Sequence, residues 1–166
     1  MLDRQSRPGE WVLLTYRLPR EPSAPRLALW RKLKRLGAAQ LGDGLVALPA
    51  DARTREQLEW AAEEVDEAGG SAGVWLARPA SKALEREVAE PMNVARAAEY
   101  AAIAEQVDEA LGSAPDERGQ ILRRLRAQMR RVERRDFFRP PERERARLAL
   151  RELASRQPDS DKQVQT

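Results

Sequence analysis

The sequence predicts an α+β fold in which a split βαββαβ sheet is followed by a C-terminal helical region of about three helices. In the first half of the chain, short apolar runs typical of strands alternate with stretches whose apolar residues recur at helical spacing. In the second half only the helical spacing occurs. The element order of the first half is that of a ferredoxin-like domain, so we expect an antiparallel sheet with strands one and three at its centre and both helices on one face.

The elements of the first half have recognisable ends. We predict strands over residues 11–16, 38–41, 45–49 and 72–77, and helices over 25–36 and 54–68. Pro25 suits a first helical turn, and Gly37 ends that helix. Asp43 stands between two glycines, which favours a hairpin between the second and third strands.

The second half is predicted to contain helices at 93–111 and 116–135 and a last helix through Leu148, Leu150 and Leu153. The apolar side of helix 93–111 is expected to include Ala98, Ala101, Ala102 and Val107. These patterns divide the chain into a sheet domain (1–80), a helical region packed on or beside it (81–156) and a polar, disordered tail (157–166).

Composition excludes several classes of function. The chain has no Cys and no His, which rules out disulfides, a thiol nucleophile, a Ser-His-Asp triad and a conventional zinc site. The N-terminus is polar and no apolar run is long enough to span a bilayer, so we expect a cytoplasmic protein that does not contact a membrane. We predict no enzyme: no catalytic residue, no metal and no bound cofactor.

Arginine is concentrated in the second half. Between Asp116 and Arg151 there are thirteen Arg and six acidic residues, although the net charge of the whole chain is only +3. Six arginines lie outside the apolar stripe of helix 116–135 and are candidate DNA-binding residues: Arg123, Arg124, Arg130, Arg131, Arg134 and Arg135. The guanidinium fork binds phosphate bidentately, so this surface is suited to a phosphate backbone.

A second basic cluster lies on helix 25–36 and consists of Arg26, Arg31, Lys32, Lys34 and Arg35. Of these, Arg31, Lys34 and Arg35 are further candidates for DNA binding. For both clusters the alternative is a solvated or internally paired face. The segment 82–111 has seven acidic residues against three basic ones, so the arginines can also pair with the chain's own acidic helix. We find no helix-turn-helix pattern.

The acidic and aromatic residues of the first half have structural explanations. Six acids crowd helix 54–68, and we expect a solvated face rather than a divalent metal site: Glu56, Glu59, Glu63, Glu64, Asp66 and Glu67. One tryptophan falls in each of four predicted elements, and we expect core packing rather than base stacking for Trp11, Trp30, Trp60 and Trp75.

Several segments together resemble the N-terminal domain of the chromate-resistance regulator family ChrB. They are the strand and turn Trp11–Pro19, the basic helix Arg26–Gly37, the hairpin Gln40–Pro49 and the segment Arg134–Phe138, and the resemblance extends over about residues 10–150. It implies a DNA-binding transcriptional regulator of chromate-resistance genes, with chromate as a candidate effector. Fuller members carry a second domain, so a separate sensor domain or protein is an expected partner, and related folds suggest a homodimer.

More distantly, the first half is similar to the central domain of the phenylacetate-degradation repressor and to small CRISPR-associated nucleases. Those nucleases place an Asp at the end of the first strand, where this chain has Thr15, Tyr16 and Arg17. A DNA-binding regulator is therefore the preferred function. A protein-interaction or dimerisation module without DNA binding is the main alternative, and a metal-dependent nuclease is disfavoured.

Overall fold

The computed structural model describes residues 9–156, so the tail predicted to be disordered lies outside the described residues. The chain divides into two compact units, with the boundary between Met92 and Asn93. Each unit has its own secondary structure and buried core, and they are described in turn.

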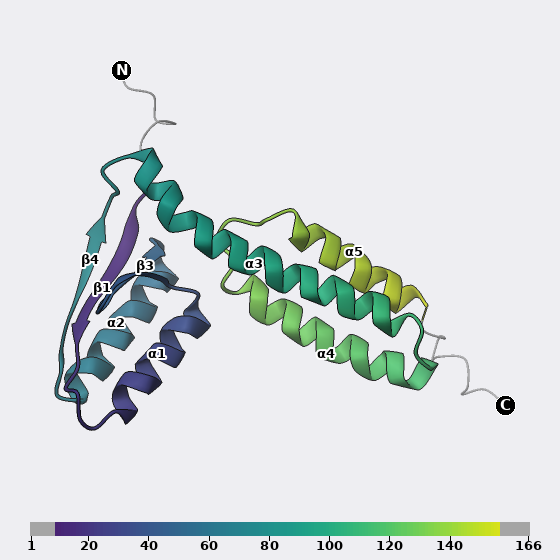
Figure 1. Cartoon of the computed structure of the whole chain (residues 1–166), viewed down its shortest axis with the longest axis horizontal. Coiled ribbons are helices and arrows are strands. Elements are labelled where there is room, and N and C mark those ends of the chain that lie inside the picture. The colour runs from purple at the N-terminus through teal and green to yellow at the C-terminus, as the bar shows by residue number, and fades with distance from the viewer. Residues whose placement is uncertain (1–8, 157–166) are drawn as a thin grey trace, which may run out of the picture. The chain divides into compact units, whose positions relative to one another are not determined.

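The first unit is the predicted βαββαβ arrangement (Figure 1). Its elements are β1 (Trp11–Arg17), α1 (Ala24–Leu36), β2 (Ala39–Gly42), β3 (Leu45–Pro49), α2 (Ala52–Glu67) and β4 (Ser71–Ala77). The four strands form one antiparallel sheet in the order β2-β3-β1-β4, which confirms the α+β class and the central position of strands one and three. Figure 1 shows α1 and α2 side by side on one face of this sheet.

The core of this unit follows from strand alternation. Val12 lies opposite Leu48 and Leu14 lies opposite Val46, and all four side chains are at most 1% exposed. Because directly opposite residues of paired strands share a face, these four form one apolar layer. The buried side chains of the two helices complete the core: Leu29, Leu33, Leu58, Ala61 and Val65.

Two local features set the ends of elements. Gly44 has φ 70°, and a Cβ there would lie 2.3 Å from the carbonyl oxygen of Tyr16, whose own N–H donates to the Gly44 carbonyl at 2.8 Å. Only glycine fits this position, which ties the β2–β3 hairpin to the end of β1. Asp51 and Thr54 form a reciprocal capping box, so α2 begins two residues before the predicted start.

The second unit is helical. It contains the later turns of α3 (Lys82–Ala110) together with α4 (Pro115–Glu133) and α5 (Glu142–Ser155). The three helices enclose a continuous apolar core: Tyr100, Ile103, Val107, Ala110, Leu122, Leu125, Met129, Val132, Ala146, Leu150 and Leu153. Ala98 is exposed, so its predicted place on the apolar side of α3 was wrong.

The predicted start of α3 at Asn93 was also wrong, since the helix begins eleven residues earlier and passes through Pro91. Proline lacks the N–H that would bond four residues back, which usually ends a helix. Here the first turns have their own support, because the Ser81 hydroxyl accepts from the Leu84 N–H at 3.1 Å.

Glu85 ties these first turns to the sheet unit. Its Oε1 accepts from the Gly9 N–H at 2.7 Å and from Trp11 Nε1 at 3.2 Å, and its Oε2 lies 3.0 Å from Lys82 Nζ. Partial burial favours the protonated carboxyl, but the bonds from Lys82, Gly9 and Trp11 outweigh it and lower the pKa of Glu85. The start of α3 therefore belongs to the first unit, and the boundary falls at Met92 rather than at residue 80.

None of the described helices is long and apolar enough to cross a membrane.

Candidate nucleic-acid interface

Helix α4 is strongly amphipathic, which determines where its arginines lie. Its buried stripe is Leu122, Leu125, Met129 and Val132, which recur at helical spacing. The six arginines predicted as DNA-binding residues fall into two groups, one directed to solvent and the other in contact with α3.

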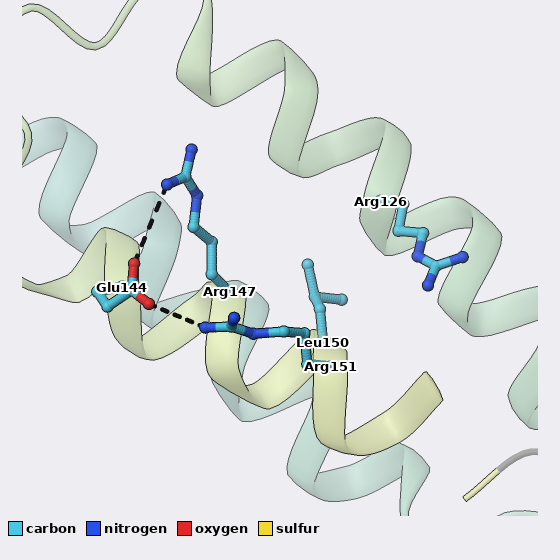
Figure 2. A pocket seen from close by; sticks show the side chains of 5 residues that line it. All are labelled: Arg126, Glu144, Arg147, Leu150 and Arg151. Carbon is cyan, nitrogen blue, oxygen red and sulfur yellow. Dashed lines mark hydrogen bonds and ion pairs between the residues drawn. The ribbon is translucent and has the colours of Figure 1, made fainter. Parts of the chain in front are cut away.

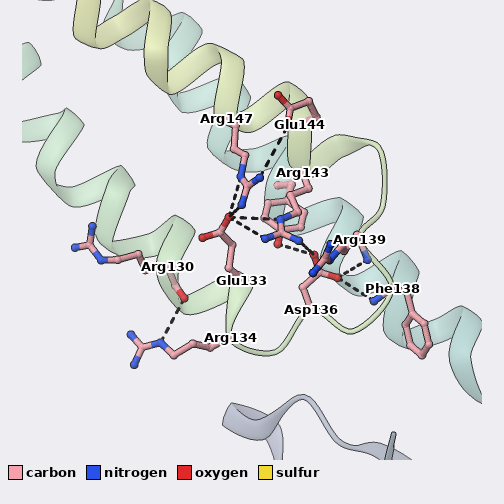
Figure 3. A network of polar contacts seen from close by, with 10 residues as sticks. Arg130, Glu133, Arg134, Asp136, Phe138, Arg139, Arg143, Glu144 and Arg147 are labelled. Carbon is pink, nitrogen blue, oxygen red and sulfur yellow. Dashed lines mark hydrogen bonds and ion pairs between the residues drawn. The ribbon is translucent and has the colours of Figure 1, made fainter.

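Five of the six predicted arginines are exposed, and one of these, Arg124, contacts α3. We call the other four, Arg123, Arg130, Arg131 and Arg134, in and directly after α4, the α4 arginine surface. Within residues 9–156, the side chains of Arg123, Arg130 and Arg131 have no ion pair or hydrogen bond. Arg134 Nε donates to the carbonyl oxygen of Arg130 at 3.3 Å (Figure 3). Arg130 and Arg131 also stand in the last turn, where a positive charge is favourable beside the helix C-terminus.

The other two predicted arginines contact α3. Arg124 donates to Gln106 Oε1 at 3.4 Å, and a single Arg135 nitrogen lies 2.8 Å from both carboxylate oxygens of Glu99. Arg124 is exposed, whereas Arg135 is only partly exposed. Pairing with the chain's own acidic helix, the alternative left open by the sequence, therefore occurs at Arg135.

The loop between α4 and α5 holds a buried carboxylate. The side chain of Asp136 is fully buried, and its Oδ2 accepts from the Tyr100 hydroxyl at 2.8 Å and lies 3.8 Å from Arg143 Nη1. Its Oδ1 accepts from the backbone N–H groups of Phe138 and Arg139 (Figure 3). Burial and the bond to Asp136 raise the pKa of Tyr100 well above its ordinary value, so the phenol remains a donor.

Glu133 and Glu144 pair with the arginines of α5. Glu133 Oε1 lies 2.6 Å from Arg147 and 3.3 Å from Arg143, and the first contact raises the pKa of Arg147. Glu144 forms ion pairs with Arg147 and Arg151, at 4.0 and 3.0 Å (Figure 2).

Glu144, Arg147 and Arg151 also line a small hollow between α4 and α5. It has a volume of about 300 Å³ and is lined by Arg126, Glu144, Arg147, Leu150 and Arg151 (Figure 2). Arg126 has no ion pair in the part of the chain that the structure describes. Three arginines against one carboxylate leave this hollow positively charged.

The predicted residues of α1 are all exposed. Lys34 Nζ lies 4.4 Å from the ring centroid of Trp30, a cation–π contact. Arg31 and Arg35 have no ion pair among residues 9–156. Lys32, on the α2 side of the helix, pairs with Glu64.

The first unit also has a broad groove that was not predicted from the sequence. It has a volume of about 1130 Å³ and is lined by Tyr16, Arg17, Leu18, Arg20, Ser23, Arg26, Leu27, Trp30, Gln40, Asp43 and Gly44. A signal was present, because three arginines surround a proline-rich loop that links a strand to a helix. We call this feature the α1 groove.

Core packing was the wrong expectation for three of the four tryptophans. Trp11 is 4% exposed, but Trp30, Trp60 and Trp75 are 48%, 53% and 56% exposed. The acids of α2 are mostly exposed, with Glu59 paired to Arg55. Among the described residues, no three acidic side chains gather closely enough to hold a metal ion.

Comparison with known proteins identifies the family. The model of the N-terminal region of the protein ChrB matches residues 26–111, which is more than half of the 166-residue chain. The chain belongs to the ChrB N-terminal family. The predicted resemblance is confirmed, and ChrB membership implies a regulatory role in chromate resistance. No curated protein and no solved structure matches the chain.

The ChrB match runs from α1 to just past the end of α3. Arg31, Lys34 and Arg35 therefore lie inside the matched residues, as do Arg26 and Trp30 of the α1 groove. The α4 arginine surface lies beyond them, so it rests on the geometry of this chain alone.

The buried carboxylate network generates a stability prediction. Replacing Tyr100 by Phe removes a donor from the buried Asp136 while preserving the ring in the core, so we expect the free energy of unfolding to fall by about 1.5–3 kcal/mol. Urea unfolding followed by far-ultraviolet circular dichroism measures this. Tyr16→Phe is the control, because the Tyr16 hydroxyl has no hydrogen bond in the described residues. Equal stability of Tyr100→Phe and the unmodified protein would show that the Asp136 network does not hold the second unit together.

Proposed function

We propose that this ChrB-family chain is a non-catalytic, DNA-binding transcriptional regulator of chromate-resistance genes, and that the α4 arginine surface contacts the phosphate backbone of duplex DNA. One observation supports the choice of surface above all. Arg123, Arg130 and Arg131 are exposed without a partner among the described residues, although the same unit pairs Arg135, Arg143 and Arg147 with carboxylates.

The chemistry of this surface suits phosphate. An arginine that a carboxylate already holds must give up that pair before it can bind a phosphate, whereas an unpaired exposed arginine loses only water. Phosphate contacts position a protein on DNA but do not read its sequence. The α4 arginine surface would therefore supply affinity and salt dependence.

We further propose that the protein acts as a homodimer, which would present two α4 surfaces to one operator, together with a separate sensor domain or protein. Sedimentation equilibrium tests the first part. The expected mass is twice that of the 18.8 kDa chain, and a single-chain mass at the concentrations used for DNA binding would refute the dimer.

Charge reversal tests the surface. We expect the triple variant R123E/R130E/R131E to bind DNA from the gene's own upstream region at least about tenfold more weakly, since three phosphate contacts become repulsive. Fluorescence anisotropy at several salt concentrations measures the affinity. If the four arginines of the surface neutralise about four phosphates, the log–log salt slope of the unmodified protein should be about −3.6, and the variant should lose most of it.

The matched control reverses three exposed arginines in and directly after α5, as R145E/R151E/R156E, and so changes the net charge by the same amount within the same unit. We expect this control to retain most of the affinity. Equal losses in the two variants would mean that only net charge matters, and unchanged binding by the α4 variant would remove the α4 surface from the proposal. A scrambled duplex measures sequence preference separately.

We also propose chromate as an effector that binds in the positively charged hollow between α4 and α5. Arg126 and Arg151 line this hollow and would hold the oxyanion bidentately. Isothermal titration of the full chain with chromate should give saturable heat that Arg126→Gln weakens, with sulfate as the comparison dianion. Absence of heat with chromate would place sensing outside this chain.

A further inference from the structure

We propose that the α1 groove is a binding site for an unpaired strand of nucleic acid, with bases stacking at Trp30 and phosphates held by Arg17, Arg20 and Arg26. This site is distinct from the α4 arginine surface. The inference goes beyond the duplex contact proposed above, because it does not depend on α4.

The charge of the groove comes from three separate segments. Arg17 is the last residue of β1, Arg20 lies in the following loop, and Arg26 stands in the first turn of α1. All three are exposed, and none has an ion pair in the part of the chain that the structure describes. Asp43 is the one carboxylate among the described residues lining the groove, so the lining has a net positive charge. Separate positive charges distributed along a groove suit a ligand that carries a series of phosphates.

The wall of the groove is aromatic and apolar. On α1, Trp30 is 48% exposed and Leu27 is 46% exposed, and Tyr16 on β1 is half-buried. Arg26, Trp30 and Lys34 are spaced four residues apart, so they follow one face of α1. The Lys34 ammonium lies over the Trp30 ring, 4.4 Å from its centroid. One face of the indole therefore already holds a cation, and a base would stack on the other face.

Size and chemistry together select an unpaired strand. At about 1130 Å³ the groove is far larger than the hollow of about 300 Å³ between α4 and α5, and a single small oxyanion would leave it largely unfilled. In a duplex the faces of the bases are stacked on one another, so an exposed indole can stack only on bases that are unpaired. An acidic peptide shares the charge of a nucleic acid but has no base to stack on Trp30.

The test uses the full chain and a labelled oligothymidine of about eight nucleotides, within the usual site size for single strands. We expect Trp30→Leu to raise the dissociation constant about tenfold through lost stacking. Trp60→Leu is the matched control, because Trp60 is similarly exposed but does not line the groove. Quenching of tryptophan fluorescence on binding should be lost in Trp30→Leu and retained in Trp60→Leu.

The arginines are tested by R17Q/R20Q/R26Q. About three neutralised phosphates give a single-strand salt slope of about −2, which this variant should bring near zero. The variant R123Q/R130Q/R131Q removes the same charge from α4 and should retain oligothymidine binding while losing duplex binding. Failure of the groove proposal and failure of the α4 proposal therefore give different results.

Competitors identify the ligand. Unlabelled oligothymidine and an RNA strand of matched length should displace the probe, and their relative strength distinguishes a DNA source from an RNA source. Poly-glutamate should displace it poorly. Equal competition by poly-glutamate, or an affinity for oligothymidine that neither Trp30→Leu nor the groove triple variant changes, would overturn the proposal.

Discussion

The buried carboxylate of Asp136 organises the helical unit. It lies in the α4–α5 loop and accepts a hydrogen bond from Tyr100 on α3, while Arg143 on α5 lies 3.8 Å away. A fully buried carboxylate is costly unless its oxygens are satisfied, so the three helices are held in the arrangement that satisfies them. The same loop includes Arg139 at φ 52°, a conformation unusual for a side chain other than glycine, and its N–H donates to Asp136. The strained backbone conformation of Arg139 allows its N–H to complete the set of donors around the Asp136 carboxylate.

This arrangement determines which arginines remain unpaired. With α5 placed by Asp136, Glu133 faces Arg143 and Arg147 and holds both, and the turn after α4 brings Arg135 to Glu99 on α3. Three acids of the unit, Glu99, Glu133 and Asp136, are thus used at contacts between its helices. On the outer side of α4, Arg123, Arg130 and Arg131 form no ion pair among residues 9–156. Because Glu99 and Glu133 pair with Arg135, Arg143 and Arg147, they are not available to the arginines on the outer side of α4, which form a localised positive surface.

The sequence predicted the sheet unit better than the site. Apolar runs and glycine turns located every strand and helix there to within about two residues, because these signals are local. The start of α3 was predicted too late because a proline such as Pro91 usually ends a helix. In the structure the energetic cost of Pro91 inside the helix is offset by the Ser81 cap and by the contacts of Glu85 with residues far away in the sequence. Likewise, the sequence does not indicate which of the six arginines lie beside α3. A tryptophan next to a core leucine can point either into the core or toward solvent. Trp30 adjoins the buried Leu29 and is nevertheless half exposed. Such details depend on neighbouring elements, which helical spacing cannot specify.

The binding surfaces proposed for the two units differ in composition, and this bears on the specificity expected of each. The outward positions of the α4 surface are all arginine, which suits phosphates and is indifferent to sequence. The α1 groove adds Trp30 and Leu27 to its arginines, and so can contact bases as well as phosphates. Stacking alone discriminates weakly among bases, because every base has an aromatic face. A preference for unpaired strands, or for duplexes that open readily, would therefore be the main selectivity of the groove. Gly44, which fits only as glycine against Tyr16, holds the hairpin that closes one side of it.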